Sequence, residues 1–163
     1  AVVTIHARNR KEMSKVPARW GDIQRAVEIR DGFKSKTLIF GNGDAVDVPD
    51  ALQKIKESGA DGAMLGRAIF GNPWTFDRAS NYGKDITLKQ KLEALIEHTR
   101  AYEELLGDIK SFYIMKKHFK AYVNSFPASS AGRPGASDLR VKLMETESAD
   151  EVEKVIRDFL NSR

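Results

Sequence analysis

Three short apolar runs mark the first part of the chain, and the second and third are each followed by a glycine-containing turn. They cover residues 1–5, 37–40 and 62–65. The first run is β-branched and alternates little, which is typical of a strand buried on both faces of a parallel sheet. Helical spacing predicts a helix from Asp22 to about Gly32, and a second from Pro49 to Ser58 and Gly59. The order predicts three parallel strands joined by right-handed crossovers.

From residue 87 onward the apolar positions repeat with a helical period. The predicted helices run from 87 to 107, from about 108 to 126, from about 137 to 147, and from 148 onward. Thr87 with Gln90 and Ser148 with Glu151 have the spacing of capping boxes. Four amphipathic helices joined by short connections predict a small bundle.

The two patterns divide the chain near residue 80. Residues 1–80 are expected to form an α/β part and residues 87–163 an all-α part, with a short helical piece and a linker over 75–86. Residues 127–135 are predicted to form a loop because they are rich in proline, glycine and serine. An apolar first strand makes a poor sheet edge. The three strands are therefore expected to belong to a larger sheet, and their open edges to allow self-association.

Composition restricts the classes of function. The 163 residues are 41% hydrophobic and 31% charged, as in ordinary globular proteins. No apolar run approaches the ~20 residues of a membrane span, and the start lacks the features of a signal peptide. The chain has no cysteine, which excludes disulfides, thiolate metal sites and a cysteine nucleophile within it. A cytoplasmic protein without metal is expected, with further residues upstream of the first strand.

The turns after the second and third strands are candidates for binding a phosphate. They read Gly41-Asn42-Gly43-Asp44 and Gly66-Arg67, and both lie at the same edge of the predicted sheet. Glycine lets backbone N–H groups approach an anion closely, and in a (β/α)8 barrel the loops after strands 7 and 8 form the usual phosphate site. Arg67 would add a charge-assisted hydrogen bond. Two tight turns without a ligand are the alternative.

A basic segment is the second candidate site. Residues 108–142 contain seven basic and two acidic residues, although the whole chain carries a net charge of only +4. Lys116 and Lys120 are spaced to share one helix face, with Lys117 between them and Arg140 on the next helix. Such a segment is either a solvated face or a site for nucleic-acid phosphates.

Six motifs resemble, in order and spacing, the C-terminal half of bacterial tRNA-dihydrouridine synthases. They are residues 5–10 (IHARNR), 41–44 (GNGD), 60–67 (ADGAMLGR), 71–74 (GNPW), 115–119 (MKKHF) and 139–140 (LR). The resemblance covers essentially the whole chain. It implies the last three βα units of an FMN-binding (β/α)8 barrel, a TIM barrel, followed by a helical tRNA-binding domain. It also implies reduction of a tRNA uridine to 5,6-dihydrouridine by FMN and NADPH.

The resemblance assigns roles to individual residues. His6 would contact the flavin, while Asn42, Gly43, Asp44, Gly66 and Arg67 would hold the FMN phosphate. The family's catalytic cysteine lies on a segment before the first strand, so no catalytic residue is expected here and this chain alone is expected to be inactive.

The same resemblance makes tRNA the expected partner of several basic residues. Lys116, Lys117, Lys120 and Arg140 would contact the tRNA, and Arg8 and Arg10 would either reach its phosphates or be solvated. His118 would be an interior histidine or an RNA contact.

Two other functions stay open at this point. One is a different FMN- or phosphate-binding TIM-barrel oxidoreductase. The other is a non-catalytic RNA-binding fragment in which the helical bundle is the working part.

Overall fold

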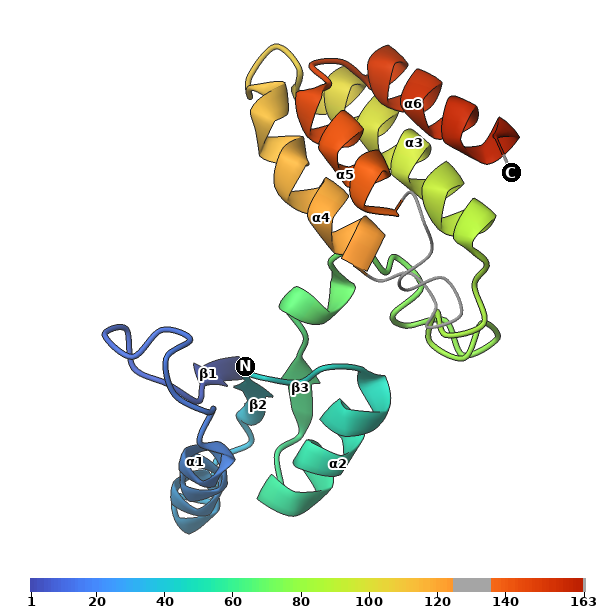
Figure 1. Ribbon diagram of the computed structural model, residues 1–163. Coiled ribbons are helices and arrows are strands. Elements are labelled where there is room, and N and C mark those ends of the chain that lie inside the picture. Colours follow the sequence, from blue (N-terminus) through green and yellow to red (C-terminus); the bar gives the residue numbers. More distant parts are fainter. Residues whose placement is uncertain (125–135, 163) are drawn as a thin grey trace. The chain divides into compact units, whose positions relative to one another are not determined.

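The computed structural model describes residues 1–124 and 136–162. They form two compact units, Ala1–Ile69 and Phe70–Arg163 (Figure 1). The division lies earlier than the predicted boundary near residue 80. The predicted short helical piece within 75–86 is wrong, since these residues form turns. The Asn72 side chain donates a hydrogen bond to the carbonyl of Tyr82 at 2.8 Å, which closes this segment into a compact loop.

The first unit contains a parallel sheet of three strands in the order β1-β2-β3. Its elements are β1 (Val2–His6), α1 (Trp20–Gly32), β2 (Leu38–Asn42), α2 (Val48–Ser58), β3 (Gly62–Met64) and the 3-10 helix η1 (Arg67–Ile69). The predicted order of strands and crossover helices is confirmed. α1 begins before the predicted Asp22, at Trp20, whose indole packs over Gly41.

The termini of α2 confirm their prediction from sequence. The Asp47 side chain accepts a hydrogen bond from the N–H of Asp50 at 2.9 Å, and Pro49 lies in the first turn. Gly59 ends the helix in the left-handed conformation with φ 69°, which glycine adopts without a steric penalty.

The predicted burial of the first strand on both faces is wrong for this structure. Val2 and Val3 are 54% and 46% exposed. Within the residues that the structure describes, β1 is hydrogen-bonded to β2 alone, so it forms an edge of the sheet. The buried cluster of this unit lies between the sheet and α1, and consists of Ala7, Ile23, Val27, Ile39 and Ala60.

The second unit contains the helical bundle. Its elements are α3 (Leu88–Leu106), the 3-10 helix η2 (Phe112–Met115), α4 (Lys116–Asn124), α5 (Ala136–Glu145) and α6 (Ala149–Asn161). The helix predicted from 108 starts later and opens with η2, where the Ser111 side chain accepts from the N–H of Tyr113. The predicted end of that helix at 126 and the predicted loop over 127–135 lie outside the described residues.

The N-terminal caps of α3 and α6 differ. At α3 the predicted capping box of Thr87 and Gln90 is complete. At α6 Ser148 accepts from the N–H of Glu151, but the Glu151 carboxylate accepts from the N–H of Glu147 instead of that of Ser148. The second capping box is therefore only half formed.

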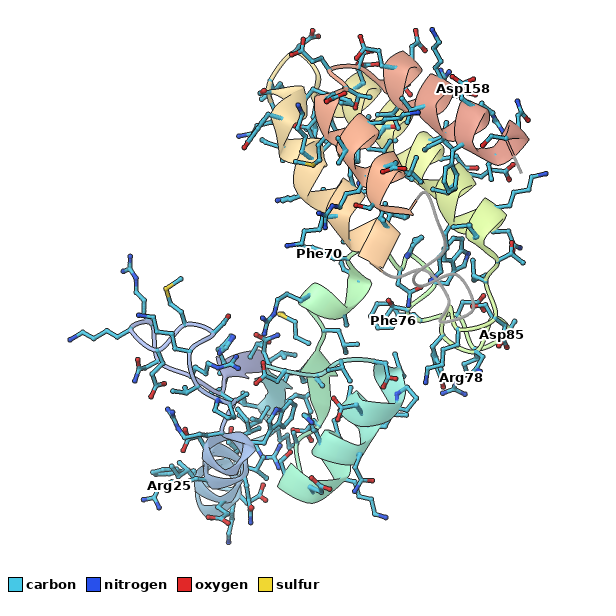
Figure 2. All side chains as sticks on the ribbon, viewed as in Figure 1. Arg25, Phe70, Phe76, Arg78, Asp85 and Asp158 are labelled. Atoms are coloured by element: carbon cyan, nitrogen blue, oxygen red, sulfur yellow. The ribbon has the colours of Figure 1, made fainter. Side chains whose placement is uncertain are left out.

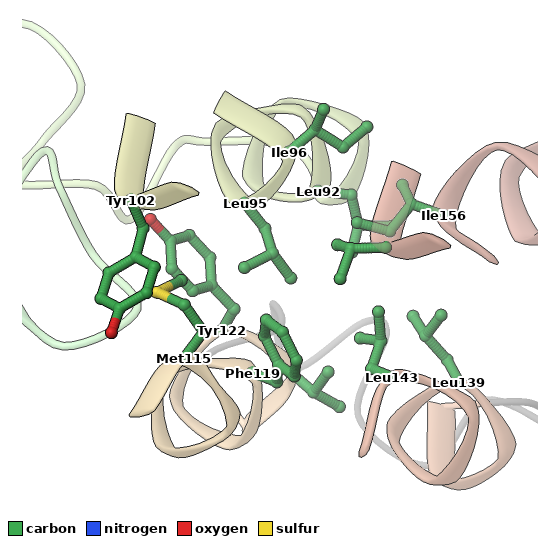
Figure 3. Close-up of a cluster of buried hydrophobic side chains, with 12 residues drawn as sticks. Leu92, Leu95, Ile96, Tyr102, Met115, Phe119, Tyr122, Leu139, Leu143 and Ile156 are labelled. Carbon is green, nitrogen blue, oxygen red and sulfur yellow. The ribbon is translucent and has the colours of Figure 1, made fainter. Parts of the chain in front are cut away.

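The bundle core joins all four α-helices and η2. Figure 3 shows this cluster of apolar side chains, in which Leu92 and Leu95 of α3 face Phe119 of α4, Leu143 of α5 and Ile156 of α6. All five are fully buried. The predicted small bundle is confirmed. No helix in the described part of the chain is long and apolar enough to cross a membrane.

Candidate functional site

A cavity of about 530 Å³ lies in the first unit, where the three strands end. Its lining includes all six residues predicted to contact the cofactor: His6, Asn42, Gly43, Asp44, Gly66 and Arg67. The register explains this convergence, because His6 is paired with Asn42 and Asn42 with Met64 across the sheet. The Asn42 amide also donates to the Met64 carbonyl at 2.7 Å, which ties the ends of β2 and β3 together.

Four further lining residues were not predicted from the sequence. They are Ala45, Val46, Met64 and Ala68. Each is a small or apolar residue within two positions of a predicted residue, so only their place beside the two turns could have pointed to them.

The end of β2 and the turn that follows it need their glycines for steric reasons. Gly43 has φ 129°, and a Cβ there would lie 2.9 Å from the Cβ of Ala18. A Cβ on Gly41 would lie 2.3 Å from a ring carbon of Trp20. The Trp20 indole N–H donates to the Gly43 carbonyl at 2.8 Å, so the start of α1 holds this turn in shape.

Asp44 connects the two turns to the loop after β1. Its carboxylate is paired with Arg8, accepts from the N–H of Ala18 at 2.8 Å, and is paired with Arg67 at 2.9 Å. The hydrogen bond from Arg8, followed by that from Ala18, lowers the pKa of Asp44 below its usual value. Asp44 is therefore ionised at neutral pH, and a carboxylate repels phosphate. Its position suits it to orient Arg67 rather than to touch an anion.

The cavity fits a phosphate group. The Arg67 side chain is 65% exposed, so its guanidinium is accessible at the cavity. A Cβ on Gly66 would meet no atom within 4 Å, which leaves its backbone open to close approach. Within the lining Arg67 balances the charge of Asp44, and the buried Arg8 pairs with Asp44 from outside it. The cavity thus combines an accessible backbone with an exposed arginine, two features that suit an anion.

The structure separates the two arginines of the loop after β1. The Arg8 side chain is only 5% exposed and also donates to the carbonyl of Val16, so its charge is directed inward to Asp44. Both arginines line a second cavity of about 500 Å³, but Arg10, unlike Arg8, is exposed. Of the two, Arg10 is the one placed to meet a partner at the surface.

The predicted basic residues of the helical unit come together in one pocket of about 720 Å³. Lys116, Lys117 and Lys120 of α4 and Arg140 of α5 line it. Tyr113, Ile114 and Met144 complete the lining and were not predicted. Sequence reasoning missed them because apolar residues at helical spacing usually belong to a core. We call this set of seven residues the basic pocket.

His118 is half-buried in the helical unit and packs against two other rings. Its ring lies 4.9 Å from that of His98 and 5.3 Å from that of Phe70, measured between centroids. Burial lowers the pKa of both histidines, and the proximity of His98 and Lys117 lowers that of His118 further. This packing supports the interior interpretation of His118 over an RNA contact.

Within the described residues no group of three or more histidine or acidic side chains is arranged to hold a metal ion. The structure instead offers a ligand two sites: polar groups and the exposed Arg67 at the ends of the parallel strands, and the basic pocket of the helical unit.

Comparison with known proteins bears on this arrangement. The family model described as dihydrouridine synthase (Dus) matches residues 1–161. The chain is 36% identical over 160 residues to a protein of Staphylococcus aureus (strain MRSA252) named probable tRNA-dihydrouridine synthase. It is 35% identical over 160 residues to one of Bacillus subtilis (strain 168) named probable tRNA-dihydrouridine synthase 2. Each alignment covers 98% of this chain and 46% of the relative, so the chain spans about half the length of these relatives. Because the family model extends over nearly every residue, the chain belongs to the dihydrouridine synthase family.

Proposed function

We propose that this chain is the part of a tRNA-dihydrouridine synthase that holds the FMN phosphate and contacts the tRNA. The observation that carries the proposal is the convergence of six predicted residues on one cavity at the ends of three parallel strands. In this proposal the first unit is the last three βα units of a (β/α)8 barrel, whose ligands bind at that end of the strands. A cytoplasmic location accords with a tRNA substrate.

The residues of the chain would bind and orient the cofactor. The backbones of Gly43 and Gly66 and the guanidinium of Arg67 would hold the phosphate, and Asp44 would keep Arg67 in place. His6 would donate a hydrogen bond to the ribityl or isoalloxazine group. The bound FMN would supply hydride transfer from NADPH to C6 of a tRNA uracil, so the protein's contribution is binding and electrostatics. The chain has no cysteine, so it holds no catalytic residue for the protonation of C5.

The helical unit would contribute affinity for tRNA. Lys116, Lys117, Lys120 and Arg140 line one pocket, and within the described part of the chain none of these four cations is paired with a carboxylate. Contacts from such cations to phosphates fix the position of an RNA without reading its sequence. Arg10 would extend this contact on the first unit.

The test uses the complete protein that carries this chain. Arg67→Ala should weaken FMN binding by about 1.5–3 kcal/mol, the usual size of a hydrogen bond to a charged group. Arg25→Ala is the matched control, because Arg25 is an exposed arginine on α1 of the same unit and does not line the cavity (Figure 2). FMN affinity is measured by fluorescence titration of the apoprotein. An unchanged FMN affinity in Arg67→Ala would show that the phosphate binds at another site.

A further inference from the structure

The basic pocket contains more than positive charge. Tyr113, Ile114 and Met144 line it and are 72%, 36% and 41% exposed. Binding of phosphates by lysine and arginine requires no apolar surface beside the cations. Exposed apolar side chains that share a pocket with four cations instead suit a ligand that has both a flat apolar part and negative charge.

Tyr113 is held in position by its neighbours. It lies on η2, where its backbone N–H donates to the Ser111 side chain at 3.3 Å. Tyr113 and Ile114 are exposed, but the residues before and after them pack into the bundle. Met115 is fully buried, and the centroid of the Phe112 ring lies 6.2 Å from that of Phe119. The exposed ring of Tyr113 is therefore carried on a segment anchored in the core, which reduces the entropy lost when a ligand binds.

The surroundings of the Tyr113 ring suit stacking. The Lys116 ammonium lies 5.7 Å from the ring centroid, within the range of a cation–π contact. Aromatic side chains on which bases stack, bordered by cations that contact the backbone, are the chemistry by which proteins bind unpaired nucleic acid. The pocket volume of about 720 Å³ lies within the range of sites for small organic groups.

We propose that the basic pocket holds one unpaired nucleotide of an RNA. Its base stacks on Tyr113 between Ile114 and Met144, and the phosphates on either side of it contact Lys116, Lys117, Lys120 and Arg140. This inference rests on the proposed tRNA-binding function and goes beyond it. A base inside a duplex is already stacked on its neighbours, so the helical unit would prefer RNA with an accessible unpaired nucleotide over a continuous duplex.

The test compares Tyr113→Ala and Tyr113→Phe in the full chain. Binding is measured by fluorescence anisotropy for an unmodified tRNA transcript and for a blunt-ended RNA duplex. Tyr113→Ala should weaken tRNA binding by about 5- to 150-fold, as expected for the loss of one stacked base, and Tyr113→Phe should leave it unchanged. Neither variant should alter duplex binding or its dependence on salt, since no cation is removed.

A second readout reports the stacking directly. A single-stranded RNA with one 2-aminopurine should lose fluorescence on binding to the wild type and to Tyr113→Phe, and should lose less on binding to Tyr113→Ala. Phe76→Ala is the matched control, because Phe76 is a 67% exposed aromatic residue of the same unit outside the pocket.

The outcomes separate this inference from the function on which it rests. If Tyr113→Ala binds tRNA as tightly as the wild type, while loss of the pocket lysines weakens binding, the nucleotide site is overturned and the phosphate contacts remain. If the wild-type chain binds neither the tRNA nor the duplex, both the proposed tRNA-binding function and this inference are wrong. Equal weakening of tRNA and duplex binding by Tyr113→Ala would also overturn the preference for an unpaired base.

Discussion

At the scale of single residues, Asp44 forms ion pairs with two arginines that differ in burial. The Arg8 side chain is 5% exposed and that of Arg67 is 65% exposed. A buried ion pair is costly to break because the remaining charge stays buried without a partner, whereas an exposed pair contributes little to stability. The Arg8 pair should therefore maintain the fold of the turn, and the Arg67 pair should orient a ligand-binding group.

This difference predicts unequal losses of stability for two substitutions. Asp44→Ala should destabilise the first unit by about 2–3 kcal/mol, less than a fully buried pair because Asp44 is partly exposed. Arg67→Ala should cost less than about 1 kcal/mol. Hydrogen exchange of the β2 amides measures both free energies of opening. Equal losses in the two variants would contradict the assigned roles.

The six residues predicted to contact the cofactor line one cavity, but the role of Arg8 was not predicted. Glycine turns after neighbouring parallel strands must meet at one sheet edge, so the positions of Asn42 and Gly66 followed from the order of the elements. Arg8 pairs with a residue 36 positions away along the chain. No local pattern distinguishes an arginine in such a pair from a solvated one.

At the scale of elements, a pair of histidines lies between α3 and α4. His98 of α3 and His118 of α4 are packed ring to ring, and the Tyr122 hydroxyl lies 3.5 Å from Nδ1 of His98. The other charged groups acting here are Lys117, which lowers the pKa of His118, and Glu97, which contributes after burial to raising the pKa of Tyr122 to about 12. Both histidines are therefore neutral in the folded state at neutral pH. Protonating them in acid is unfavourable because burial disfavours the charged form.

The helical unit should accordingly lose stability in mild acid. The pKa of each histidine is lower in the folded than in the unfolded state, so the unfolded state binds more protons below the ordinary value of about 6.5. Stability should be complete above that pH and should fall as the pH drops toward the folded pKa values. Thermal unfolding followed by circular dichroism between pH 7.5 and 5 measures this effect. His118→Phe should flatten the pH dependence, and an equally steep decline in that variant would exclude the pair as its source.

The charged face of α4 leads to a prediction about salt. If Lys116, Lys117 and Lys120 each neutralise one phosphate, their joint replacement by alanine should reduce the slope of log K against log[salt] by roughly 2–3 units. Binding should weaken about equally for different tRNAs, and the rate at saturating tRNA should change little in the complete enzyme. Lys36, Lys89 and Lys154, which do not line the pocket, provide a charge-matched triple control. An unchanged slope and affinity would identify α4 as a solvated face.

Elements were predictable where local chemistry decides them. The caps at Thr87 and Asp47 depend on residues only three positions apart, so the termini of α3 and α2 could be predicted from the local sequence. The burial of β1 and the late start of α4 depend on which partners an element has, and that information is not local. Tyr113 was missed for the same reason, since only the folded bundle shows that it faces outward.

At the scale of the whole molecule, the first unit has an exposed apolar strand at the edge of its sheet. Val2 and Val3 are exposed on β1, and Leu38 is 43% exposed on β2. Open strand edges with apolar side chains invite pairing with other chains. We expect this chain alone to self-associate as its concentration rises, which analytical ultracentrifugation measures. A monomer at all concentrations would contradict this expectation.

The same chain should show no NADPH-dependent reduction of unmodified tRNA. In the proposed function the protonation of C5 needs a cysteine, and this chain contains none. Loss of NADPH absorbance with the complete protein, and its absence with this chain, is the expected result. Turnover by the chain alone would refute the proposal that the catalytic cysteine lies outside it.

The contact between Trp20 and the glycine turn also gives the protein an internal optical reporter. The indole lies over Gly41 and donates to the carbonyl of Gly43, which lines the cavity. An anion that settles on this turn therefore alters the environment of the chromophore, and its emission intensity and wavelength should change in proportion to occupancy. The chain has one other tryptophan, Trp74. With Trp74 replaced by phenylalanine, the emission of the remaining indole would follow ligand binding in real time without any attached dye.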